Sequence, residues 1–149
     1  MNFVNVSTYY PRQCGLASFS KDLRDSLVKA GHKVWITAIS DKPYTYPDEV
    51  YCEIQQGTKG DYLAAARMIN NSPQIQMAII QHEYGIFGGR DGEFMIDFVA
   101  HLKKPFLLVT HTVLPRPTPG QRVILQILAR QAAAVISMSR RSAHLLGVW

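Results

Sequence analysis

Three short polar segments of this 149-residue chain contain the residue types that bind phosphate or exchange protons. A glycine just ahead of a helix lets a ligand approach backbone N–H groups, which favour phosphate. An imidazole can position a hydroxyl, donate to a phosphate or exchange a proton near neutral pH. These groups indicate recognition of a phosphorylated or hydroxylated ligand. The segments are Cys14-Gly15, His82-Glu83-Tyr84 and Thr110-His111-Thr112.

Strands that alternate with helices would have to hold these segments in place. Amphipathic spacing predicts helices, β-branched and apolar runs predict strands, and turn residues separate them. This alternation predicts an α/β fold, a Rossmann-like doubly wound parallel sheet of about six strands with helices on both faces. The expected strands are residues 3–7, 33–39, 50–54, 77–81, 106–110 and 134–138. The expected helices run from 17 or 18 to 30, from a cap at Asp61 to 69, over 92–102 and 119–130, and onward from a cap at Ser139.

The sheet should bring the polar segments to one edge. Residues 77–81 and 106–110 are continuous apolar runs, as expected of interior strands covered on both faces. In open parallel sheets, ligands bind beyond the carboxyl ends of the strands. Because adjacent strands lie about 5 Å apart, His82 and His111 are predicted neighbours that could face a single ligand.

Each of these residues also has a structural interpretation. His111 and His82 could make internal hydrogen bonds, and Gly15 could serve only a turn. A metal site from His82, Glu83 and His111 lacks the usual ligand spacing, so no metal is expected.

Two further loops follow the same edge. Residues 85–92 hold four glycines, which predicts either a mobile or closely approached loop or an ordinary connection. The loop at 115–119 is stiffened by prolines and offers Arg116 to an anion. Neither GxGxxG nor GxxxxGK[ST] is present, which argues against a dehydrogenase or a P-loop ATPase.

Composition bounds the remaining possibilities. Hydrophobic residues make up 47% and charged residues 18%, typical of one globular domain over 1–149. The longest apolar runs are far short of the roughly 20 residues of a membrane span. The amino terminus does not resemble a signal peptide, so a cytoplasmic location is expected. Cys14 and Cys52 lack a CxxC spacing, which disfavours a disulfide framework or zinc site.

A net charge of +5 suits an anionic ligand, a phospholipid surface or nucleic acid without selecting one of them. The densest basic groups are only the pairs Lys103-Lys104 and Arg140-Arg141, so nucleic acid is not an expected partner.

The chain resembles the amino-terminal domain of glycosyltransferase family 4, the retaining enzymes of the two-domain GT-B kind. The matching segments follow the family's order and together span nearly the whole chain. They are Tyr10-Pro-Arg-Gln-Cys-Gly-Leu-Ala-Ser-Phe, His82-Glu-Tyr-Gly-Ile-Phe-Gly-Gly, Thr110-His-Thr-Val-Leu-Pro and Ile136-Ser-Met-Ser139.

The resemblance implies a role for each matched position. Gly15 and Cys14 would approach the diphosphate of a nucleotide-sugar donor; many members carry paired glycines where this chain has Cys14-Gly15. His111 would lie at the reaction centre beside the transferred sugar. The acceptor side of the cleft would include His82, Glu83, Tyr84 and Thr112. The nucleotide-sugar is a co-substrate, and neither a cofactor nor a metal is implied.

The family places most donor contacts in a second Rossmann domain, which residues 1–149 do not contain. The isolated chain is therefore expected to be inactive, and its sugar or lipid acceptor is not identified. A second interpretation is a non-catalytic α/β module that binds a phosphorylated or glycan ligand at the same edge. A third adds peripheral contact with the inner membrane surface through Lys21, Arg24 and Lys29 of the first helix.

Overall fold

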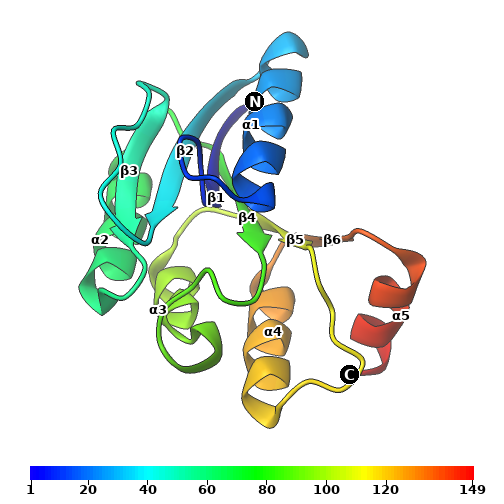
Figure 1. The fold of residues 1–149 in the computed structure, drawn as a ribbon. Coiled ribbons are helices and arrows are strands. Elements are labelled where there is room, and N and C mark those ends of the chain that lie inside the picture. The colour runs from blue at the N-terminus through cyan, green and yellow to red at the C-terminus, as the bar shows by residue number, and fades with distance from the viewer.

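A single parallel β-sheet organises the chain, and the computed structural model describes all of residues 1–149. The six strands lie in the order β3-β2-β1-β4-β5-β6 (Figure 1). The elements are β1 (Asn2–Ser7), α1 (Gly15–Lys29), β2 (Lys33–Ser40), β3 (Val50–Gln55), α2 (Lys59–Asn71), β4 (Met77–His82), η1 (Arg90–Gly92), α3 (Phe94–His101), β5 (Phe106–Thr110), α4 (Pro119–Gln131), β6 (Ala134–Ser137) and α5 (Arg140–Val148).

Helices cover both faces of the sheet, as predicted. Helix α1 lies on one side, and α2, α3 and α4 lie on the other (Figure 1). Each face of the sheet has its own hydrophobic core. Successive residues of β4 point into one core and then the other, because side chains alternate along a strand. Ala78 and Ile80 join the larger core beneath α2, α3 and α4, whereas Ile79 joins the smaller core beneath α1.

The strand order changes direction between β1 and β4. From β1 the chain moves outward through β2 and β3, then returns to place β4 on the other side of β1. Ligands of doubly wound sheets bind at the carboxyl end of such a switch point. Strands β4 and β5 are both interior, as their apolar runs predicted.

Helix starts differ in detail from the sequence prediction. Helix α1 begins at Gly15, because the Cys14 thiol caps it by accepting from the Ala17 N–H at 3.4 Å. Helix α2 begins at Lys59 after Thr58, so the predicted Asp61 cap is wrong. The Asp61 carboxylate instead accepts from the Gln55 N–H at the end of β3, at 2.9 Å.

The helix predicted over 92–102 is present as α3 and begins at Phe94. A short 3₁₀ turn is followed by α3, because Gly92 has a φ of +83°, outside the helical range. The Ser139 cap is confirmed, since its side chain accepts from the Ser142 N–H at 3.1 Å.

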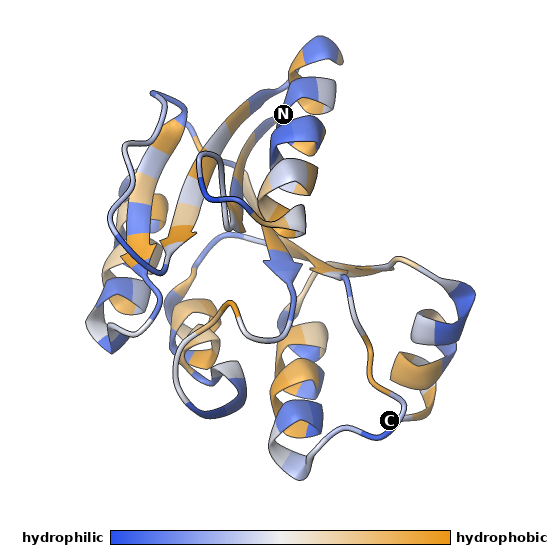
Figure 2. Ribbon diagram, in the orientation of Figure 1, coloured by the Kyte–Doolittle hydropathy of each residue, from blue (hydrophilic) through white to orange (hydrophobic).

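Hydropathy follows this layering, with apolar residues concentrated along the sheet and hydrophilic ones on the outer side of α1 (Figure 2).

None of the helices combines the length and apolar character required to cross a bilayer. Two of the three basic side chains expected to meet a membrane, those of Lys21 and Arg24, are engaged within the chain. Lys21 donates to Asp25 at 3.1 Å, and Arg24 donates to the Val34 carbonyl at 3.0 Å.

Candidate functional site

A cavity of about 520 Å³ opens at the switch point of the sheet. We call it the switch-point cavity. Its walls come from the β1–α1 loop, the start of α1 and the segments that follow β4 and β5. Four residues predicted from the sequence line it together. The lining residues are Arg12, Cys14, Gly15, Leu16, Phe19, Glu83, Ile86 and His111.

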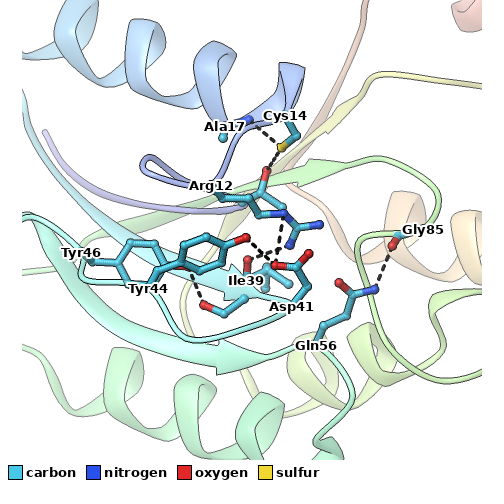
Figure 3. Close-up of polar contacts among 11 residues, drawn as sticks. Arg12, Cys14, Ala17, Ile39, Asp41, Tyr44, Tyr46, Gln56 and Gly85 are labelled. Atoms are coloured by element: carbon cyan, nitrogen blue, oxygen red, sulfur yellow. Dashed lines mark hydrogen bonds and ion pairs between the residues drawn. The ribbon is translucent and has the colours of Figure 1, made fainter.

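The first turn of α1 presents backbone N–H groups at this cavity. The Cys14 sulfur accepts from the Ala17 N–H (Figure 3) and lies 3.2 Å from the Thr8 hydroxyl. A Cβ added at Gly15 would meet no atom within 4 Å. The space beside Gly15 is therefore open, and the positive end of a 15-residue helix is accessible to an anion.

Arg12 supplies the cation of the cavity, and the sequence analysis missed it. Its Nη1 donates to the Ile39 carbonyl at 3.2 Å, and its Nε lies 3.9 Å from Asp41 (Figure 3). These contacts hold the guanidinium beside the α1 amino terminus. Arg116, the anion contact considered from the sequence, does not line the cavity. The sequence did contain a signal for Arg12, because this residue lies between Pro11 and Gln13 in the loop that ends at Cys14-Gly15.

His111 both lines the cavity and makes a structural hydrogen bond. Its Nε2 lies 2.7 Å from Gln81 Oε1, and the Gln81 amide nitrogen donates to Asn5 Oδ1 at 3.0 Å. The Gln81 oxygen is therefore the acceptor, so the His111 proton is on Nε2 and Nδ1 remains an acceptor. Burial lowers the pKa of His111, although Glu83 opposes this shift, so the ring is neutral at pH 7. The edge of Phe19 packs against it with ring centroids 4.7 Å apart.

His82 lies outside the cavity. The His111 N–H donates to the His82 carbonyl at 3.0 Å, which confirms that the two are backbone neighbours. Their rings nevertheless lie on opposite faces of the sheet. The His111 ring bonds to the Gln81 side chain, and His82 follows Gln81 in β4, so the His82 side chain points to the other face. The two histidines are therefore neighbours, as predicted, but only His111 lines the switch-point cavity.

The His82 ring is buried at 2% exposure, between Tyr84 and Phe87. Burial lowers its pKa to about 4. Nδ1 of His82 has no hydrogen-bond partner. No three His, Cys, Asp or Glu side chains gather as metal ligands, so His82, Glu83 and His111 do not form the alternative metal site.

Glu83 is fixed at the cavity wall by two other predicted residues. The Thr112 hydroxyl donates to one carboxylate oxygen at 3.0 Å, and the Tyr84 N–H donates to the other at 2.9 Å. Thr112 and Tyr84 do not line the cavity themselves. The Tyr84 hydroxyl is buried without a partner, and burial raises its pKa.

The glycine-rich loop after β4 packs closely against the end of β3. Gln56 Nε2 donates to the Gly85 carbonyl at 2.8 Å (Figure 3). A Cβ on Gly88 would overlap the Gln56 carbonyl oxygen and crowd Phe94. The close approach predicted for this loop is confirmed, and it places Ile86 on the cavity wall.

Comparison with known proteins identifies the fold. No protein-family model and no curated protein matches the chain. An alpha-glucosyltransferase in complex with UDP and a 13-mer DNA matches at 20% identity and a TM-score of 0.65, over 94% of this chain and 37% of that one. An alpha-glucosyltransferase in complex with UDP matches at 18% identity and a TM-score of 0.64, over 93% of this chain and 35% of that one. An alpha-glucosyltransferase in complex with UDP-glucose and DNA containing an abasic site matches at 19% identity and a TM-score of 0.63, over 93% of this chain and 36% of that one.

These similarities show a shared Rossmann-like fold. The chain spans little more than a third of the length of the structures that it matches. Because some of them contain DNA, the comparison gives no support to the expectation that nucleic acid is not a partner.

Proposed function

We propose that this chain is the acceptor-side domain of a retaining glycosyltransferase of the GT-B kind, related to family 4. The complete enzyme would transfer a sugar from a nucleotide-sugar donor, and residues 1–149 alone would not turn over. One observation carries the proposal. The α1 amino terminus, the Arg12 guanidinium and the His111 ring share the switch-point cavity, in a fold shared with UDP-bound alpha-glucosyltransferases.

The cavity offers the groups that a donor diphosphate requires. Arg12 and the free N–H groups at the start of α1 supply positive charge and hydrogen-bond donors. The open space at Gly15 admits phosphate oxygens close to the backbone. Since Arg12 and the helix dipole supply this charge, the proposal needs no metal.

His111 is positioned to act beside the diphosphate. Gln81 holds its Nε2, so Nδ1 is the nitrogen available to orient a sugar hydroxyl. A neutral ring fixed in one tautomer needs no reorganisation as charge develops in the reaction. We assign Glu83 to the acceptor side of the cavity, with Thr112 and Tyr84 as positioning residues.

Nuclear magnetic resonance titration of the chain with UDP and UDP-glucose tests the donor site. The amides of residues 15–17 and 111 should shift, and His111→Ala should weaken UDP-glucose binding, because His111 is assigned to a hydroxyl of the sugar. The matched control is His144→Ala on the exposed surface of α5, which should bind as the unmodified chain does. Shifts confined to other regions would contradict the proposed site.

Turnover separates the enzyme from the non-catalytic binding module. In a longer protein that contains this chain, His111→Ala should lower kcat by about 100-fold or more, the scale seen when one stabilising group is removed. Equal turnover in the two proteins would refute the role of His111. A longer protein that binds UDP-glucose but transfers no sugar would favour the binding module.

A further inference from the structure

Two polar side chains lie in the interior of the sheet where apolar residues would be expected. Asn5 of β1 is 1% exposed, and Gln81 of β4 is fully buried. Both strands are interior, and strands covered by helices on both faces are usually apolar. The strand neighbours of Asn5 follow that rule, since it pairs with Ile36 of β2 and Ile79 of β4. Packing alone therefore does not account for an amide at either position.

Hydrogen bonding between the two amides does not account for them either. Gln81 Nε2 donates to Asn5 Oδ1 at 3.0 Å, but Asn5 Nδ2 is buried without an acceptor. An unpaired buried donor destabilises a fold. The pair makes one further contact, because Gln81 Oε1 lies 2.7 Å from His111 Nε2. The two amides and the ring thus form a buried network that ends at the switch-point cavity.

The direction of the Asn5 amide determines what the His111 ring offers to a ligand. With the Asn5 oxygen toward Gln81, the Gln81 amide donates to Asn5 and accepts from His111, so the ring proton lies on Nε2. If Asn5 presented its nitrogen instead, both amides would reverse and the ring proton would move to Nδ1. His111 Nδ1 makes no hydrogen bond within the chain and is not buried. It accepts in the first arrangement and would donate in the second.

Asn5 can influence a ligand only through Gln81. It does not line the switch-point cavity, and its one side-chain hydrogen bond is the bond from Gln81. Without the Asn5 oxygen, the Gln81 amide could rotate and donate to His111 Nε2 from its nitrogen. The ring could then carry its proton on either nitrogen, and only one of the two forms would accept a hydrogen bond at Nδ1.

We propose that Asn5 is a positioning residue, whose oxygen holds Gln81 in the direction that keeps the lone pair of His111 Nδ1 at the switch-point cavity. The consequence for binding rests on the proposed function, because it takes a hydroxyl of the donor sugar as the group that Nδ1 accepts. The control of the ring proton by Asn5 does not depend on that function. The buried amides of β1 and β4 thus serve the site rather than the stability of the sheet.

Nitrogen resonance spectra of the His111 ring test the proposal without a ligand. The unmodified chain should show a single neutral tautomer with the proton on Nε2. In Asn5→Ala, the Nδ1–H form should rise to about half of the molecules, because both directions of the freed Gln81 amide then make one hydrogen bond to the ring. Asn5→Leu, which is nearly isosteric and leaves no space for a water molecule, should give the same result.

Ser20→Ala is the matched control for loss of a buried hydrogen bond. The Ser20 hydroxyl donates to Ser7 Oγ at 2.7 Å beneath the same helix, and no hydrogen bond connects this pair to Gln81 or His111. The control should destabilise the chain and leave the ring proton on Nε2. A purely structural role of Asn5 would make Asn5→Ala behave as Ser20→Ala does.

Paired titrations with UDP and UDP-glucose connect the tautomer to the donor sugar. UDP has no sugar for Nδ1 to meet, so its affinity should be the same in Asn5→Ala and in the unmodified chain. UDP-glucose should bind about twofold more weakly, because only about half of the molecules keep the ring in the accepting form.

Two results would overturn the inference. The first is a ring proton on Nδ1 in the unmodified chain, which requires no variant to fold. The second is an Nδ1–H form below about 10% in whichever of Asn5→Ala and Asn5→Leu folds. Failure of the donor proposal is seen separately, because an unmodified chain that binds no UDP-glucose would refute that proposal and leave the measured tautomers as they are.

Discussion

Replacing Gly15 with alanine should stabilise the fold while weakening donor binding. Gly15 is the first residue of α1, and its φ lies outside the left-handed region. The added methyl group would meet no atom within 4 Å, so the folded chain accepts it without strain. Alanine lowers the conformational entropy of the unfolded chain, which stabilises such positions by about 0.5 kcal/mol. For a chain of this size the melting temperature should rise by about 1–2 °C.

The effect on the ligand has the opposite sign. The methyl group fills the space through which a phosphate oxygen would reach the N–H groups of the first turn. Loss of one hydrogen bond to a charged group costs about 1.5–3 kcal/mol. Since about 1.4 kcal/mol corresponds to a tenfold change, UDP should bind about 10- to 100-fold more weakly.

Calorimetric titration with UDP and thermal unfolding measure the two effects on the same samples. Gly60→Ala is the matched control, because Gly60 also lies in the first turn of a helix with nothing within 4 Å of its added Cβ. It should stabilise the chain and leave UDP affinity unchanged. Wild-type UDP affinity in Gly15→Ala would refute the close approach of the diphosphate to this backbone.

Three further changes test other parts of the structure. Burial lowers the pKa of His82 to about 4 from 6.5, so the unfolded chain takes up a proton before the folded chain does. The free energy of unfolding should therefore fall by about 3 kcal/mol as the pH falls from 6.5 toward 4. In His82→Leu, urea titrations should show a smaller fall over the same pH range than in the unmodified chain. Gly88→Ala should lower the free energy of unfolding by about 1–3 kcal/mol, because its methyl group overlaps the Gln56 carbonyl; Gly57→Ala, with open space around it, should not. Gln81→Leu removes the acceptor of His111 Nε2–H, so nitrogen shifts of the ring should change from one tautomer to a mixture, and an unchanged spectrum would contradict the assigned bond.

The sheet was predictable because its signals are local. Continuous apolar runs identified β4 and β5 as interior strands, and a polar residue directly after each strand located the functional edge. Cys14, Gly15 and His111 follow strand ends in the sequence, so their meeting at one cavity required only the order of the strands.

The direction of individual side chains was not predictable in the same way. His82 and His111 both follow apolar runs, yet β4 extends through His82 and carries its ring to the face opposite Gln81. The contact of Arg12 with the Ile39 carbonyl joins a loop to the end of another strand, and no local pattern indicates it. Such errors arise because a shift of one residue in the end or the register of a strand moves a side chain to the other face of the sheet.

Gly15 and Gly88 show how packing separates a structural glycine from one that folding does not explain. At Gly88 the Gln56 carbonyl occupies the position of a Cβ, so the fold itself requires glycine. At Gly15 the backbone is ordinary and the space is empty, and alanine would favour the helix more. Folding therefore gives no reason for the missing side chain at Gly15, whereas a ligand drawn to Arg12 and the α1 amino terminus does.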